Sequence, residues 1–188
     1  IGLLALVLLQ HARRAGRFDD EGTAIPLADQ DRTRWDRAGV AEGVVLVGEG
    51  LRRTPDRPNP YVVQAAIAAA HALAPTWAET PWDSIASWYD VLLTVHATPV
   101  VRLNRAAALA ERDGAAAGLA ELDAIDGLEG YAIAHASRGE LLARLDRGPE
   151  AVAAFDRALA LGLAPPTAAW VARRRAKVAS PPRPDHRG

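Results

Sequence analysis

The stretch that decides the fold is Glu150-Ala-Val-Ala-Ala-Phe-Asp-Arg-Ala-Leu159. Ala151, Phe155 and Ala158 are spaced so that they share one face of a helix, with a large ring between two small residues. The same face recurs 33 residues earlier, and again 33 residues before that, as Gly118, Leu122 and Ile125 and then as Ile85, Tyr89 and Leu92. A period near 34 with two helices per unit is typical of tetratricopeptide repeats, so the sequence predicts stacked helical hairpins.

The other helix of each unit repeats less completely. His135, Gly139 and Leu142 share one face, and the residues 33 positions earlier are Arg102, Ala106 and Leu109. The small residue recurs where two helices would touch, whereas the bulky ring does not. Because one hairpin cannot bury both of its apolar faces, neighbouring hairpins should share a core and leave a concave groove. The predicted fold is all-α, a right-handed tetratricopeptide-like superhelix of about nine helices.

Prolines preceded by capping residues mark the expected helix starts. Asn59-Pro60, Thr80-Pro81 and Thr98-Pro99 each place a hydrogen-bond acceptor before a residue that needs no amide donor in the first turn. Further helices are expected over residues 2–16, 29–53, 115–125, 130–146, 149–161 and 166–178, the last as a solvated cap carrying Arg173-Arg174-Arg175. The expected divisions are an N-terminal helical pair with an acidic loop (1–58), tetratricopeptide-like repeats (59–179) and a disordered tail (180–188).

Composition excludes several classes of function. The net charge of −1 argues against a protein that binds nucleic acid over its whole surface. The absence of cysteine excludes disulfides and thiolate metal sites. The apolar opening over residues 1–9 is too short to span a bilayer and is predicted to be a buried helix end. A cytoplasmic protein without membrane contact is therefore expected.

No motif for catalysis is present. The sequence lacks G-x-S-x-G, a glycine-rich phosphate loop and a recognisable triad, and its five histidines do not have metal-ligand spacing. The carboxylates Asp19, Asp20 and Glu21 fall in a solvated loop, where nothing would raise a pKa for acid catalysis. We therefore expect neither an enzyme nor a bound cofactor or metal ion.

The densest polar cluster is Asp29-Gln-Asp-Arg-Thr-Arg-Trp-Asp-Arg37. As a contact surface it would use Trp35 as an anchor, with Arg32 and Asp36 as polar partners, because Trp and Arg dominate the energy of many interfaces. The alternative is a helix start capped by Asp29, with Arg32 and Asp36 forming an i,i+4 ion pair of ~0.2–0.5 kcal/mol.

A second group of polar residues lies within alanine-rich helices. Gln64, His71 and Asn104 could line the groove, or could be hydrogen-bonded residues of the core or its edge. Arg102, Asn104 and Arg105 are the candidates for a clamp on a peptide carboxylate. The full set of candidate partner-binding residues is Asp29, Asp31, Arg32, Trp35, Asp36, Gln64, His71, Arg102, Asn104 and Arg105.

The order of short motifs along the chain adds a family resemblance. The motifs include residues 2–9, His11-Ala-Arg-Arg14, Asp29-Gln-Asp-Arg32 with Trp35-Asp36, Gln64–His71, Leu103-Asn-Arg-Ala106, Leu128-Glu-Gly-Tyr131 and Leu141-Leu-Ala-Arg-Leu145. Together they resemble the C-terminal extension of a group of extracytoplasmic-function (ECF) sigma factors of the sigma-70 family, typical of actinobacteria. The resemblance covers about residues 1–178.

The resemblance implies a regulatory protein-interaction domain that modulates transcription initiation. Its partners would be the sigma-factor core of the same full-length chain, RNA polymerase or another protein. DNA would be reached only indirectly, through promoter-reading regions that precede the extension in that family. Two alternatives remain open from the residues themselves. One is a free-standing tetratricopeptide-type scaffold that binds peptide segments, and the other is a small-molecule-sensing helical domain.

Overall fold

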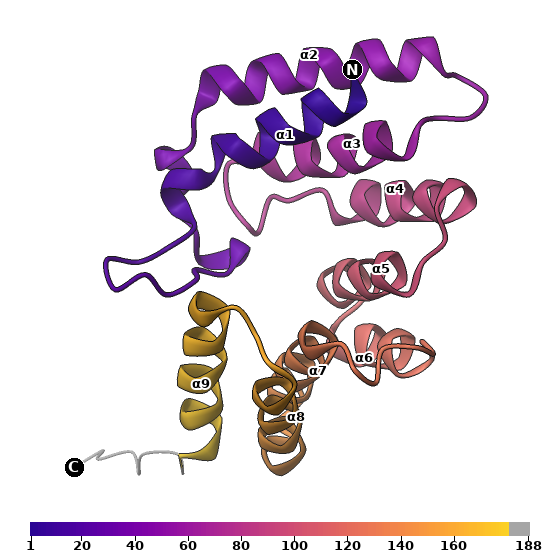
Figure 1. The fold of residues 1–188 in the computed structure, drawn as a ribbon. Helices are drawn as coiled ribbons and strands as arrows, with labels where there is room; N and C mark the ends of the chain where they lie inside the picture. The colour runs from indigo at the N-terminus through magenta and orange to yellow at the C-terminus, as the bar shows by residue number, and fades with distance from the viewer. Residues whose placement is uncertain (181–188) are drawn as a thin grey trace.

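A computed structural model describes residues 1–180, and these residues form nine α-helices in a curved stack (Figure 1). The helices are α1 (Gly2–Ala12), α2 (Arg37–Arg53), α3 (Pro60–Leu73), α4 (Trp82–Val95), α5 (Pro99–Arg112), α6 (Ala115–Asp123), α7 (Ala132–Arg144), α8 (Gly148–Leu161) and α9 (Pro165–Ala179). Consecutive helices pack as antiparallel neighbours. The described part of the chain holds no strand beyond one isolated bridge between Phe18 and Ala24. The predicted all-α class is confirmed. The predicted tail lies, from residue 181 onward, outside the described residues.

Two of the three predicted proline caps are confirmed. The Asn59 side chain accepts a hydrogen bond from the Tyr61 amide at the start of α3, and Thr98 accepts one from the Val101 amide at the start of α5. The prediction for Thr80 was wrong, because α4 begins one residue after Pro81 and no side chain caps it.

The N-terminal helix boundaries differ from those predicted. The first helix ends at Ala12 rather than at residue 16, and the second begins at Arg37 rather than near Asp29. Three short 3-10 turns occupy the interval, at Arg14–Gly16, Leu27–Asp29 and Arg32–Arg34. The cap of α2 is Asp36, whose carboxylate accepts hydrogen bonds at 3.1 Å from the amides of two residues in the first turn. Asp29 was therefore the wrong choice of cap, since Asp36 satisfies the orphan amides instead.

The repeat predicted from the sequence is present in the packing. The three sets that begin at Ile85, Gly118 and Ala151 lie on or just after α4, α6 and α8, every second helix of the stack. Eight of the nine side chains or glycines are buried, and Tyr89 is half-buried. The side chain of Phe155 has no exposed surface and lies against Gly139 of α7, where an added Cβ would be 2.7 Å from its ring.

Paired helices approach most closely at small residues. A Cβ placed on Gly118 of α6 would lie 2.4 Å from the Cβ of Ala110 and 2.8 Å from the carbonyl oxygen of Ala106, both on α5. Glycine is thus required at this position for a steric reason that involves backbone atoms of the neighbouring helix. The close contact brings the apolar faces of α5 and α6 together over the core that they share with α7, α8 and α9.

Three overlapping cores run along the stack. The first contains Leu9, Val47 and Ala65 of α1, α2 and α3; the second joins α3, α4 and α5; the third joins α5 to α9 around Leu142. Helix α3 contributes to both of the first two cores. The predicted division after residue 58 therefore falls in a loop, and α1 and α2 share a core with the helix that follows that loop.

The loop between α1 and α2 reaches across the stack to α9 (Figure 1). The guanidinium of Arg173 donates to Asp19 at 3.0 Å and also pairs with Glu21, residues 154 and 152 positions away in sequence. The amide of Ala24 donates to the carbonyl oxygen of Pro166 at 3.1 Å. The acidic cluster was predicted to be a solvated loop, whereas two of its carboxylates connect the two ends of the stack. None of the helices in the described part of the chain is long and apolar enough to cross a membrane.

Replacing Gly118 by alanine should separate α5 from α6 and destabilise the protein by about 1–3 kcal/mol, as overpacking of a well-packed core does. The matched control is Gly48→Ala in α2, where an added Cβ meets only the flexible end of Arg52 at 3.3 Å. The control should be neutral, or more stable by up to about 1 kcal/mol because of helix propensity. Urea-induced unfolding followed by circular dichroism measures both, and equal stability of the two variants would contradict the assigned packing.

Candidate functional site

The concave side of the stack holds four adjoining cavities. We name them by their lining: the apolar cavity of about 270 Å³, the charged cavity of about 700 Å³, the polar cavity of about 440 Å³ and the aromatic cavity of about 190 Å³. Glu111 lines the apolar, charged and aromatic cavities, and Leu27 lines the charged, polar and aromatic ones. Shared walls make them one continuous surface, and the α1–α2 loop supplies part of its edge through Leu27.

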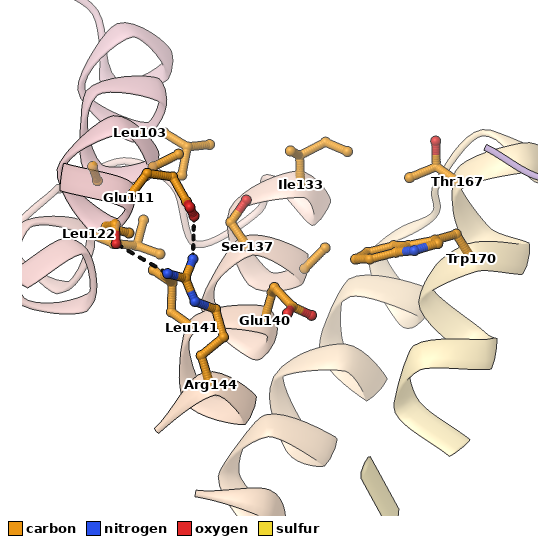
Figure 2. Close-up of a pocket in the computed structure, with 14 residues that line it drawn as sticks. Leu103, Glu111, Leu122, Ile133, Ser137, Glu140, Leu141, Arg144, Thr167 and Trp170 are labelled. Carbon is orange, nitrogen blue, oxygen red and sulfur yellow. Dashed lines mark hydrogen bonds and ion pairs between the residues drawn. The ribbon is translucent and has the colours of Figure 1, made fainter. Parts of the chain in front are cut away.

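The apolar cavity lies between α5, α7 and α9 (Figure 2). Figure 2 shows Trp170 reaching from α9 across the cavity from Glu111 and Arg144, with Ile133 and Ser137 of α7 between them. Arg144 pairs with Glu111 and also donates to the carbonyl oxygen of Ala110 at 3.2 Å. The polar groups at the edge are therefore satisfied by one another, so this cavity is suited to an apolar group.

The C-terminal arginine run forms ion pairs, and two of its members, Arg173 and Arg174, line the charged cavity. Arg174 binds Glu140 through two hydrogen bonds of 2.6 and 3.0 Å, and Arg175 binds Asp156 through bonds of 2.9 and 3.1 Å. With Arg173 paired to the α1–α2 loop, every guanidinium of the run has a carboxylate partner. The predicted solvated helix end is exposed at Arg173 and half-exposed at Arg175, but the sequence did not predict that these arginines pair with carboxylates. Asp29, one of the predicted site residues, lines this cavity and is exposed.

The polar cavity brings together three of the predicted groove residues. Gln64 and His71 of α3 and Asn104 of α5 all line it, as the hypothesis of a groove required. Arg13 contributes the only guanidinium among the lining residues, and none of these residues is a carboxylic acid. The polar and aromatic cavities are continuous, because they share four lining residues: Leu27, His71, Tyr89 and Asn104.

Trp35 is a buried part of the fold, with 5% of its surface exposed. The guanidinium carbons of Arg13 and Arg32 lie 5.3 and 5.2 Å from its ring centroid, within the range of cation–π attraction. Gly16 allows this packing, because an added Cβ would be 3.1 Å from the indole nitrogen. The described chain therefore does not present Trp35 as the exposed anchor that the sequence suggested.

Arg32 and Asp36 do not form the i,i+4 pair that their spacing predicts. Arg32 instead donates at 2.7 and 2.6 Å to the carbonyl oxygens of His71 and Ala74, at the C-terminal end of α3. A positive charge is favoured there because the last carbonyls of a helix lack partners. Asp36 caps α2, and Asp31 is exposed and caps a short turn by accepting from the Thr33 amide at 2.9 Å.

His71 lies beside an aromatic pair. Its ring is 6.3 Å from Trp77 and 5.3 Å from Trp82, and those two rings are 4.6 Å apart. Burial, together with the positive charges of Arg13 and Arg32, lowers the pKa of His71 to about 4, so the imidazole is neutral at pH 7. Its Nδ1 atom is buried and has no hydrogen-bond partner among the described residues.

The predicted carboxylate clamp is not formed. Arg105 donates to Asp90 at 2.7 Å and to Glu121 at 3.0 Å, and Arg102 donates to the carbonyl oxygen of Ala124 at 3.2 Å. Only Asn104 lines the polar cavity. Arg102, Asn104 and Arg105 therefore do not converge on one cavity, because helical spacing turns the two arginines toward α4 and α6.

Helix α1 exposes apolar side chains that the sequence reasoning assigned to a buried helix end. Leu3, Leu4 and Val7 are 54%, 53% and 53% exposed, while Ala5 and Leu9 are fully buried against α2 and α3. The signal was available, because apolar residues cover more of this helix than the single stripe that one core can bury. This exposed side of α1, together with His11 and Arg14 one and two turns further on, is a candidate contact surface.

The carboxyl of Asp19 in the α1–α2 loop does not have the raised pKa that an acid catalyst needs. Hydrogen bonding from the Thr23 amide, together with the ion pair to Arg173, holds the pKa of the Asp19 carboxyl below its usual range, the opposite of what an acid catalyst needs. Within residues 1–180, no three side chains of His, Cys, Asp or Glu gather into a metal-binding group.

The low pKa of His71 makes stability depend on pH. The unfolded chain binds this proton near pH 6.5 and the native protein only near pH 4, so the contribution is complete above pH 6.5 and is lost as pH falls toward 4. The free energy of unfolding should therefore fall with a slope of up to about 1.4 kcal/mol per pH unit between these values, and His71→Gln should remove that part of the slope. Urea unfolding at several pH values measures it, and identical slopes for the two proteins would contradict the assignment.

Comparison with known proteins places the chain among relatives without an assigned activity. Residues 1–50 match a family of unknown function, DUF6596. The uncharacterized protein R00370 of Rhizobium meliloti (strain 1021) is 42% identical over 183 residues, which cover 97% of this chain and 43% of that protein. No solved structure matches. The chain thus spans less than half the length of this relative, and its first 50 residues, which include α1 and most of α2, carry the DUF6596 signature.

Proposed function

We propose that this chain is a regulatory interaction domain of an ECF sigma factor, and that the exposed side of α1 docks onto the sigma core of the same polypeptide. The observation that carries the proposal is the row of half-exposed Leu3, Leu4 and Val7 on a helix whose opposite side is packed against α2 and α3. Contiguous apolar surface of this kind marks interaction sites. Through this contact the domain would modulate transcription initiation, and DNA would be reached only through the sigma core.

The arrangement of α1 resembles the centre and edge of an interface. Leucine and valine side chains lie near its start, and the polar His11 and the basic Arg14 follow on the exposed side. An apolar centre bordered by polar groups is the usual composition of a specific protein contact. The relative from Rhizobium meliloti is consistent with a partner within one polypeptide, because more than half of that protein lies outside the region matched to this chain.

The motif Asp29-Gln-Asp-Arg32 enters the proposal in a different role from the one the sequence suggested. Arg32 binds carbonyl oxygens at the end of α3, and Asp31 caps a turn, so both serve the fold. Asp29 and Asp36 remain exposed and open to contact from a partner. We therefore assign docking mainly to α1, with this motif holding the α1–α2 loop in place.

A binding experiment with two matched double variants tests the proposal. The sigma core encoded in the same reading frame is produced separately, and its affinity for the domain is measured by isothermal titration calorimetry. Leu3→Ser with Val7→Ser should weaken binding about tenfold or more, because both side chains would lie at the centre of the contact. Val45→Ser with Leu73→Ser, which alters apolar residues on α2 and α3 that are more exposed than Leu3 and Val7, should leave the affinity unchanged.

Several outcomes would contradict the docking assignment. These are the absence of a promoter-binding region in the same reading frame, no binding by the wild-type domain, and equal binding by the two double variants. Loss of binding only on Trp170→Ala would move the contact from α1 to the apolar cavity. Self-association of the wild-type domain that the Leu3 and Val7 changes abolish would identify a second copy as the occupant.

A further inference from the structure

We propose that the polar cavity is a binding site for a small organic carboxylate whose apolar body extends into the aromatic cavity. The site is separate from the exposed side of α1 and does not depend on the docking proposed there. It consists of Arg13 as the cation, Gln64, His71 and Asn104 as neutral hydrogen-bonding groups, and Trp77 and Trp82 at the apolar end.

The charge around this cavity is unbalanced. Burial, and after it the nearby charges of Arg17 and Arg32, lowers the pKa of Arg13. None of these three arginines takes part in an ion pair within residues 1–180. Elsewhere in the stack, half-buried arginines such as Arg105 and Arg174 reach carboxylates. Here the lining contains no acid that could do so.

Arg13 is the least satisfied of the three guanidinium groups. Among residues 1–180, its buried Nε atom has no partner, and its only side-chain hydrogen bond is a long one of 3.4 Å to Gln30. Burial, then the charges of Arg17 and Arg32, lower its pKa to about 10, so it still carries its charge at pH 7. A half-buried charge without a counterion is costly, and an anion in the cavity would supply the missing partner.

The hydrogen-bonding groups around Arg13 suit an anion with one charge. Gln64 and Asn104 offer amide donors, and the neutral His71 has an unpartnered Nδ1 that can hold a proton in one of its tautomers. One guanidinium balances one carboxylate, which it can bind with two parallel hydrogen bonds. A doubly charged phosphate would be matched by two guanidinium or ammonium groups, and Arg13 is the only such group in the lining.

The size and the apolar walls indicate the rest of the ligand. The polar cavity of about 440 Å³ adjoins the aromatic cavity of about 190 Å³, and together they fall in the range of small-molecule sites. Leu6, Ile67 and Val101 line the first, and Trp77, Trp82 and Ile85 line the second. An aromatic ring attached to the carboxylate would be placed against these apolar walls.

The test uses a charged and a neutral probe of the same shape, 2-naphthoate and 2-naphthamide. Calorimetry should show that the wild-type chain binds the carboxylate about tenfold or more tightly than the amide, because only the carboxylate can form charged hydrogen bonds to Arg13. The Arg13 Nε–H resonance, followed by nitrogen-15 NMR, should shift on adding naphthoate and remain in place on adding naphthamide.

Variants separate this site from general attraction by positive charge. Arg13→Met should lower the naphthoate affinity to that of naphthamide, whereas Arg37→Met, which alters an exposed arginine outside the cavity, should leave it unchanged. Asn104→Asp alters an exposed residue, and it should weaken naphthoate binding about tenfold or more while sparing naphthamide.

Three results would overturn the proposal. They are equal affinity of the wild type for the two probes, equal effects of Arg13→Met and Arg37→Met, and an unaltered naphthoate affinity in Asn104→Asp. A competition with inorganic phosphate tests the class of anion. Phosphate should fail to displace bound naphthoate, and displacement of naphthoate by an equal concentration of phosphate would overturn the assignment of an organic monocarboxylate.

Discussion

The contact between the α1–α2 loop and α9 is the interaction on which the concave site depends. Without this contact, the first and last helices of the described chain would be connected only through the helix pairs that lie between them. With Arg173 bound to Asp19 and Glu21, and Pro166 bound to the Ala24 amide, the loop holds Leu27 at the edge of three cavities. Exposed ion pairs contribute only about 0–1 kcal/mol each, so the closure draws on the main-chain hydrogen bond from Ala24 to Pro166 as well.

The sequence was sufficient to predict the helices and their pairing, because that information is local and periodic. Gly118 and Phe155 reveal their packing through spacing alone, and Asn59 and Thr98 mark helix starts through chemistry within one turn. The N-terminal segment was harder to predict, since several acidic residues compete to cap a helix there. Asp36 caps α2 only because the chain before it forms 3-10 turns that fit around Trp35, which is a tertiary constraint.

The candidate site was predictable only in part, for the same reason. Gln64, His71 and Asn104 were considered as groove residues because they are polar side chains within alanine-rich helices, with a hydrogen-bonded place in the core or at its edge as the alternative. All three line the polar cavity. Arg13 was missed, since its lack of a counterion becomes visible only when the whole lining is known. Arg105 of α5 was named as a candidate for binding a partner because its carboxylate neighbours could not be seen in the sequence. Asp90 and Glu121 are distant from it along the chain and form ion pairs with it in the fold.

Closure of the stack by the loop is the central claim, and a distance measurement tests it most directly. The chain contains no cysteine, so spin labels can be attached only at introduced sites. Asp20→Cys in the loop and Ala172→Cys on α9 place labels on exposed residues next to the ion pairs without removing any of them. Pulsed electron paramagnetic resonance should give one short, narrow distance distribution. A broad or long distribution would contradict a closed concave site.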